Sequence, residues 1–143
     1  MIRELGKGSR ETLFEDGSLH VDKFPDGKGG MWYKVFIGEI QVARMTIRKH
    51  FGIYTIDNVK TSEQFLRRGW MEKLTSIAIA DFRREHTETL WVDIPKQYAS
   101  LYKKLGFVVA FFGKTLKGIR QQRQWHYAYD NNNIDKYVWL KFK

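Results

Sequence analysis

The stretch of the chain with the most potential for chemistry runs from Lys60 to Leu74 and reads K-T-S-E-Q-F-L-R-R-G-W-M-E-K-L. The pattern predicts a loop that enters a helix, where unpaired backbone N–H groups meet the positive end of the helix dipole. Such a helix start binds anions, and Arg67 and Arg68 add two positive charges beside it. Gly69 lets the backbone approach a phosphate closely. A basic helix start that only faces solvent fits the same residues equally well.

A second informative stretch, from Tyr98 to Val108, reads Y-A-S-L-Y-K-K-L-G-F-V. Pro95 suits the first turn of a helix, and Gly106 suits the left-handed residue that ends one. The apolar residues between them recur at helical spacing and would pack on one face: Tyr98, Leu101, Tyr102 and Leu105.

The elements that must position these two stretches begin with strands. Alternating apolar and polar residues, rich in β-branched and aromatic types, predict four of them. The turn P-D-G-K-G-G and the pair Gly38-Glu39 separate them by short connections, which favours an antiparallel meander. The predicted strands are Leu19 to Phe24, Trp32 to Ile37, Ile40 to Ile47 and Ile53 to Val59, with a turn from Arg48 to Gly52.

A helix and further strands follow. The helix is predicted by an apolar stripe of Trp70, Leu74, Ile77, Ala78 and Phe82. With the strands before and after it, this helix makes a β-α-β crossover, which joins parallel strands. The fold class is therefore α/β or mixed α+β, with a mixed, mostly antiparallel sheet in a single domain of residues 1–143. The later strands are Thr89 to Ile94, Phe107 to Phe112 and Tyr137 to Phe142.

Composition narrows the function. The net charge of +9 favours an anionic partner, such as a nucleotide-bearing cofactor, nucleic acid or an acidic surface. The chain has no cysteine, which excludes thiolate metal sites and a cysteine nucleophile. The scattered histidines predict no metal site, and no apolar run is long enough to predict a membrane span. We expect a cytoplasmic protein.

The segment Gly113 to Lys136 is long for a connection between adjacent strands, and long connections are often functional. Part of it, Gln121 to Tyr129, could form a hairpin with the last strand. Basic and aromatic residues together can hold phosphates and stack bases, although a hairpin with solvated charges fits them as well. The basic residues of this segment are Lys114, Lys117, Arg120, Arg123 and His126.

An R-R-G loop that opens a helix, then a strand, then L-Y-K-K-L-G-F, resembles the GNAT N-acetyltransferase superfamily from Ile53 to about Phe112. The resemblance implies a GNAT-like sheet with a splayed strand, and acetyl-CoA or another acyl-CoA as co-substrate. It places the pyrophosphate of that co-substrate on the backbone of Leu66, Arg67, Arg68, Gly69, Trp70 and Met71.

The same resemblance assigns further roles. The end of the splayed strand, Asn58, Val59 and Lys60, would pair with the pantetheine arm. Tyr102 would protonate the leaving thiolate, and a phenol with an unperturbed pKa of about 10 holds that proton at neutral pH.

The chain also departs from the family pattern. Leu66 and Met71 stand at the ends of the loop where the family usually has Gln or Arg and a small residue. The segment Phe51 to Tyr54 lacks the glutamate base that some members carry. His50, Asp57 and Asp93 remain as candidate bases, but none occupies a family position.

The N-terminal part departs as well. The family usually has two helices between its first two strands, and only P-D-G-K-G-G and Met31 separate Phe24 from Trp32. Either these helices are absent, or Arg10 to Phe14 holds a residual helix and the strand order differs. In both cases the acceptor side would be unusually open.

The sequence therefore predicts an acyl-CoA-dependent N-acyltransferase that acetylates an amine of a large or anionic acceptor, a protein or a nucleic acid. The alternative is a catalytically inactive GNAT-like fold that binds nucleic acid or protein. The chain would be a monomer or a homodimer.

Overall fold

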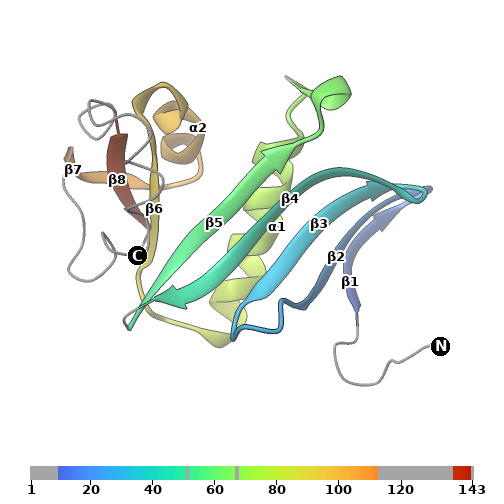
Figure 1. Cartoon of the computed structure of the whole chain (residues 1–143), viewed down its shortest axis with the longest axis horizontal. Helices are drawn as coiled ribbons and strands as arrows, with labels where there is room; N and C mark the ends of the chain where they lie inside the picture. Colours follow the sequence, from blue (N-terminus) through green and yellow to red (C-terminus); the bar gives the residue numbers. More distant parts are fainter. Residues whose placement is uncertain (1–9, 51, 67, 113–136, 143) are drawn as a thin grey trace. The chain divides into compact units, whose positions relative to one another are not determined.

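The computed structural model describes residues 10–50, 52–66, 68–112 and 137–142, which form two compact units (Figure 1). The first unit holds the described residues of Met1–Arg48 and Ile56–Thr87, and the second holds those of Lys49–Thr55 and Glu88–Lys143. The segment Gly113 to Lys136, with its predicted basic hairpin, lies outside the described residues. The expectation of a single domain stays a prediction.

The first unit is built on a meander of antiparallel strands. β1 (Glu11–Asp16), β2 (Leu19–Pro25), β3 (Met31–Ile37) and β4 (Ile40–His50) pair in chain order. The last strand of this half of the chain is β5 (Ile53–Thr61). The predicted meander is confirmed for β2, β3 and β4, which pair antiparallel in chain order.

Two details of the N-terminal half differ from the sequence predictions. Arg10 to Phe14 is not a residual helix, because this stretch leads into β1, a strand that the sequence analysis did not predict. The chain does not turn at Arg48, since β4 continues to His50. The predicted absence of helices between β2 and β3 is confirmed, as residues 26–30 make only a turn.

Asp26 closes that turn. Its carboxylate accepts hydrogen bonds from the backbone N–H groups of Lys28 and Gly30 at 2.7 and 2.9 Å. Its other oxygen lies 2.6 Å from Nε of Arg48 on β4. Burial alone would raise the pKa of Asp26, but these hydrogen bonds and the charge of Arg48 bring it below its ordinary value. One ionised side chain thus joins the turn to β4.

Helix α1 (Trp70–Glu85) covers one face of the first unit's sheet (Figure 1). The predicted stripe is confirmed at its centre, because Leu74, Ala78 and Phe82 are all buried. These side chains belong to the same core as inward-facing strand residues that have almost no exposed surface: Val21, Tyr33, Val35 and Met45. Burial of this apolar surface is the main force that holds the helix in place.

A buried carboxylate adds a specific anchor between α1 and the strands. Asp81, only 5% exposed, accepts a hydrogen bond from the Tyr33 hydroxyl at 2.8 Å and lies 2.8 Å from Nζ of Lys23. Arg84, one turn further on, contacts its other oxygen at 2.6 Å. Burial favours the neutral acid, but the hydrogen bonds from Lys23, Tyr33 and Arg84 outweigh it and lower the pKa of Asp81. The helix therefore has a single register against β2 and β3.

The second unit contains the remaining strands and a short helix. β8 (Tyr137–Phe142) lies between β6 (Leu90–Pro95) and β7 (Val108–Phe112) and is antiparallel to both. The segment between β6 and β7 forms a 3₁₀ turn, η2 (Lys96–Tyr98), and then α2 (Ala99–Lys104). Along the chain, β5, α1 and β6 follow in the predicted order.

Two predictions about α2 are wrong and one is confirmed. Pro95 ends β6 instead of starting the helix, and the Tyr98 side chain is 54% exposed instead of packing in the apolar stripe. The reason is that α2 starts only at Ala99, so Tyr98 precedes it. Gly106 has the expected positive φ, +105°, and a Cβ there would lie 2.9 Å from the Phe142 ring. In the described part of the chain, no helix has the length and apolar character that crossing a membrane would need.

We predict that Asp81→Asn destabilises the protein strongly, because it leaves Lys23 as a buried cation without its counter-charge. Breaking such a pair costs about 3–5 kcal/mol, measured here as the free energy of unfolding in urea. Removing both charges, as Asp81→Leu with Lys23→Met, should recover most of that loss. The exposed Glu15→Gln is the control, and a loss no larger than the control's would contradict this role of Asp81.

Candidate functional site

The start of α1 has the geometry of an anion-binding helix terminus. Gly69 is the residue that precedes the helix, in the left-handed conformation at φ +78°, and no side chain caps the helix from this position. Its carbonyl accepts the helix's first backbone hydrogen bond, from Lys73 at 3.1 Å. A Cβ placed on Gly69 would meet no atom within 4 Å, so the space beside the first turn is open. An anion can therefore approach these backbone N–H groups directly.

The neighbours of Gly69 differ in how much they are exposed. Leu66 is 50% exposed and Arg68 is exposed, while Trp70 and Met71 are half-buried. Arg67, the remaining predicted residue of the loop, lies outside the described residues. A 3₁₀ turn, η1 (Glu63–Phe65), brings the chain from β5 to this loop. The sequence prediction of a loop that opens a helix is thus confirmed as local structure.

The end of β5 is distorted at Asn58. With φ +55°, it is the only non-glycine residue in the described part of the chain that has a positive φ. Its side-chain amide donates to the Thr46 hydroxyl at 3.1 Å, and that hydroxyl donates to the Asp57 carbonyl at 3.1 Å. These bonds hold a conformation that L-residues other than asparagine and aspartate seldom adopt.

Beyond the distortion, the strand turns its residues to solvent. Asn58, Val59 and Lys60 are all exposed, and Val59 keeps 40% of its surface accessible although it is apolar. After the strand, the Ser62 N–H donates to the Val42 carbonyl at 2.7 Å, and its hydroxyl donates to Gln41 at 2.9 Å. These two hydrogen bonds of Ser62 connect the chain to β4 again just before η1. The three residues predicted to meet the pantetheine arm lie in a strained, accessible strand end.

Tyr102 lies on α2 in the second unit. Tyr102 is 3% exposed, and its ring meets Phe107 edge-on at 5.4 Å between centroids. Among the residues that the structure describes, its buried hydroxyl has no hydrogen-bond partner. Burial raises the pKa of this phenol well above its ordinary value. Tyr102 is therefore protonated at neutral pH, where it can donate its proton but does not act as a base. A buried hydroxyl without a partner is costly, and a bound group that accepts its hydrogen bond would remove that cost.

The candidate bases lie in different places. Asp57 is half-buried near the end of β5 in the first unit, whereas Asp93 is 5% exposed on β6 in the second. His50 ends β4. Among the described residues, no three side chains of the metal-binding types are grouped so that they could hold an ion.

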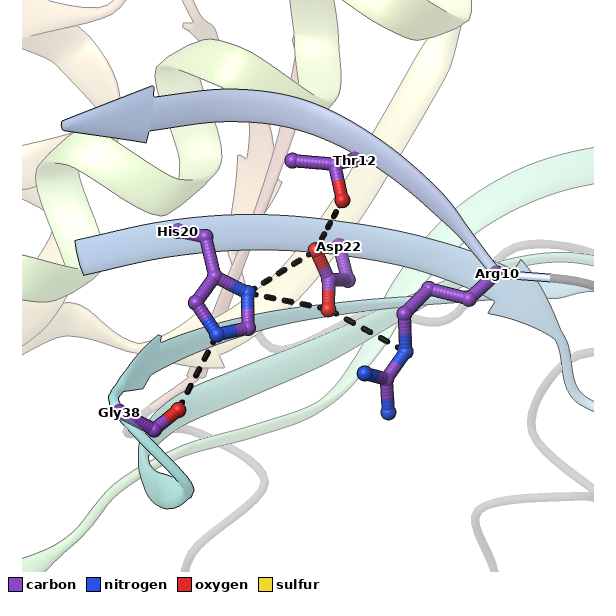
Figure 2. A network of polar contacts seen from close by, with 5 residues as sticks. All are labelled: Arg10, Thr12, His20, Asp22 and Gly38. Carbon is purple, nitrogen blue, oxygen red and sulfur yellow. Dashed lines mark hydrogen bonds and ion pairs between the residues drawn. The ribbon is translucent and has the colours of Figure 1, made fainter. Parts of the chain in front are cut away.

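A polar network on β2 was not predicted from the sequence (Figure 2). Asp22 is fully buried, and its carboxylate lies 3.1 Å from Nδ1 of His20 and 3.2 Å from Nε of Arg10. It also accepts a hydrogen bond from the Thr12 hydroxyl at 3.0 Å. The other ring nitrogen of His20 faces the Gly38 carbonyl at 3.1 Å. Both nitrogens are thus occupied by acceptors, which suits a charged imidazolium and excludes His20 as a free base.

The strand pattern itself contains the signal for this network. His20 and Asp22 are two residues apart on a strand that the sequence predicts, so their side chains point to the same face. The residues that complete it, Arg10 and Gly38, could not be paired with them before the register of β1 and β3 was known.

Comparison with known proteins decides the fold. No protein-family model matches the chain, and no curated protein matches it by sequence. Solved structures do match, among them a Bacillus subtilis acetyltransferase in complex with CoA at 20% identity and a TM-score of 0.60. The match covers 80% of this chain and 76% of that one.

The chain has the fold of the GNAT acetyltransferases. A GNAT family acetyltransferase from Elizabethkingia anophelis with acetyl-CoA bound matches at 17% identity and a TM-score of 0.60, over 80% of this chain and 76% of that one. ElaA from Escherichia coli matches at 11% identity and a TM-score of 0.59, over 80% of this chain and 68% of that one. The GNAT fold and the mixed α+β class predicted from the sequence are thus confirmed.

The network around His20 predicts a stability that depends on pH. The hydrogen bond to Asp22, aided by the Gly38 carbonyl and opposed by burial and by Arg10, raises the pKa of His20 in the folded protein. A raised folded pKa gives stability that is fully present below the unfolded value of about 6.5 and is lost as the pH rises through the folded value. The unfolding free energy of the wild type should therefore be higher than that of His20→Gln, and this difference should be largest at about pH 5.5 and smallest at about pH 9.

His86→Gln is the matched control for that measurement, because His86 stacks on Phe82 outside this network. Urea unfolding of the three proteins across the pH range gives the comparison. Curves for wild type and His20→Gln that run parallel over the whole range would contradict the charged state assigned to His20.

Proposed function

We propose that the chain is an acyl-CoA-dependent N-acyltransferase that transfers an acetyl group from acetyl-CoA to an amine. The observation that carries this proposal is the open, uncapped start of α1 at Gly69, in a chain with the GNAT fold. Solved proteins of the same fold hold CoA or acetyl-CoA. The net charge of +9 favours so anionic a co-substrate.

The residues that would hold acetyl-CoA lie on two consecutive segments of the first unit. The backbone N–H groups of the loop from Leu66 to Met71 would bind the pyrophosphate, with the charges of Arg67 and Arg68 beside them. The Leu66 N–H already donates to the Glu63 carbonyl at 3.3 Å, so the later N–H groups would make most of these bonds. The exposed backbone of Asn58, Val59 and Lys60 would bond the pantetheine amides as a neighbouring strand does. Met71 is compatible with this role because its side chain is half-buried and the open space is beside Gly69.

Acetyl-CoA, when bound, supplies the thioester carbon that the acceptor amine attacks. Tyr102 contributes the proton at its phenol oxygen that the departing thiolate needs. Burial keeps the phenol protonated at neutral pH, and among the described residues its hydroxyl has no other hydrogen-bond partner. The sequence has no cysteine on which a protein thioester could form, and we propose that the acetyl group passes directly to the amine.

We further propose that the acceptor is large, an amine on a protein or another macromolecule. The support is the turn between β2 and β3, which is closed by Asp26 and stands where the family usually has two covering helices. The competing proposal is an inactive fold that only binds a macromolecule. Binding of the co-substrate distinguishes the two proposals. Only the enzyme must bind acetyl-CoA.

Gly69→Val should abolish acetyl-CoA binding, because the side chain would fill the open space beside the helix start. Gly17→Val is a matched control, since Gly17 also has a positive φ, +63°, and nothing within 4 Å of its Cβ. Both variants should lose a similar stability of about 1–2 kcal/mol from backbone strain. In a thermal-shift titration, wild type and Gly17→Val should gain about 2.7 kcal/mol at a ligand concentration of 100 times Kd, and Gly69→Val should gain nothing. Equal affinity of the two variants would contradict the proposed site.

Tyr102→Phe separates catalysis from packing. Removing a buried hydroxyl that has no partner should leave thermal stability unchanged or slightly higher. If Tyr102 donates the proton, kcat should fall by roughly 10²–10⁴-fold with little change in the KM for acetyl-CoA. A stopped assay for free CoA thiol, with a panel of protein and polyamine acceptors, provides the measurement. Unchanged turnover in the variant would show that Tyr102 serves only to pack against Phe107.

A further inference from the structure

The face of the first unit's sheet that lies opposite α1 carries an unusual combination of side chains. The register places Phe24 of β2 opposite Trp32 of β3, and Lys34 of β3 opposite Arg44 of β4. Helix α1 lies on the other face of the sheet, where Asp81 contacts Lys23 and Tyr33. Successive residues of a strand point to opposite faces, so Phe24, Trp32 and Lys34 point away from the helix. The cation–aromatic face consists of Arg10, Phe24, Trp32, Lys34, Phe36 and Arg44.

Cations and rings alternate across this face. The Arg10 guanidinium lies 5.6 Å from the centre of the Phe36 ring and 6.0 Å from that of Phe24. The Lys34 ammonium lies 5.1 Å from Phe24 and 5.0 Å from Trp32. The Arg44 guanidinium lies 5.5 Å from the same Trp32 ring. Each distance is within the reach of a cation–π contact.

Two of the three cations on this face, Lys34 and Arg44, have no anion paired with them among the described residues, whereas Arg10 is paired with Asp22. Lys34 and Arg44 are directly opposite one another, and like charges in that position repel. Within the part of the chain that the structure describes, neither makes an ion pair, and the buried Nε of Arg44 has no hydrogen-bond partner. Burial, with the charges of Arg44 and Arg10, lowers the pKa of Lys34. The carboxylate of Asp22, opposite Lys34 in register, is already bonded to Arg10, His20 and Thr12.

We propose that the cation–aromatic face binds a single strand of nucleic acid. Its phosphates would pair with Lys34 and Arg44, and its bases would stack on the half-buried rings of Phe24 and Trp32, since the Phe36 ring is already stacked by His20. Surfaces that combine cations with accessible rings bind unpaired strands, because every base has a face that can stack. A duplex keeps its bases paired and stacked on one another, and an acidic peptide would use the charges but leave the rings without a partner.

This inference does not depend on the proposed acyl transfer. Its residues lie on β2, β3 and β4 and on the chain before β1, and none of them was assigned to the acetyl-CoA site. Loss of nucleic-acid binding with intact acetyl-CoA binding, or the reverse, would therefore tell the two apart.

The test uses the full chain and a fluorescently labelled oligothymidine of about 20 nucleotides, titrated by anisotropy at about 50 and 200 mM salt. The variant Lys34→Gln with Arg44→Gln keeps the length of both side chains and removes their charges. Lys28→Gln with Lys103→Gln is the matched control, because it removes two exposed positive charges elsewhere. Trp32→Leu tests stacking separately. Urea unfolding and the acetyl-CoA thermal shift verify that each variant is folded.

We expect Lys34→Gln with Arg44→Gln to weaken binding at least about 10-fold and to flatten the salt slope by about 1.4, from two phosphate contacts at 0.7 each. Trp32→Leu should weaken binding by roughly 10- to 100-fold with little change in that slope. The control should bind as the wild type does. The proposal is overturned if the wild type does not bind at low salt, or if the control loses as much as the variant. It is equally overturned if a DNA duplex or polyglutamate competes as well as the single strand.

Discussion

The ionised carboxylate of Asp81 is the contact on which the geometry of the first unit most depends. It holds Lys23 of β2, Tyr33 of β3 and its helix neighbour Arg84 at hydrogen-bond distance, inside a core where a lone charge would be very unfavourable. Apolar packing alone would allow α1 to slide or rotate, whereas these directional bonds permit one register. Because α1 is fixed in this way, its first turn and Gly69 have a fixed place relative to β2 and β3.

The two candidate binding surfaces of the first unit follow from this arrangement. The side of the sheet that receives α1 carries Lys23 and Tyr33, so the alternation of strand residues sends Phe24, Trp32 and Lys34 to the opposite side. Only the short turn at Asp26 connects β2 to β3, and the opposite side of the sheet carries half-buried rings and cations. In β5, Asn58 adopts a left-handed backbone conformation with φ +55°, and the residues at the end of this strand are exposed.

Strands and helices with a regular spacing of apolar residues were predicted from the sequence. Irregular strands and contacts between residues far apart in the chain were not. The alternation at 19–24 located β2, and the stripe from Trp70 to Phe82 located α1, because both depend on neighbours in sequence. β1 was missed because its register shifts between Thr12 and Phe14, so Leu13 and Phe14 are half-buried next to each other and the period of two is lost. The partners of Asp81 could not be predicted, since Tyr33 is 48 positions away and nothing near Asp81 indicates it.

Hydrogen–deuterium exchange with and without acetyl-CoA tests the central claim most directly, because it reports on backbone amides themselves. If acetyl-CoA binds at the start of α1, exchange should slow in the segments from Asn58 to Lys60 and from Leu66 to Glu72, and stay unchanged in β1 to β3. Peptides of the outer strands serve as the internal reference in the same experiment. Unchanged exchange of these two segments at saturating acetyl-CoA, or protection only elsewhere in the chain, would contradict the account.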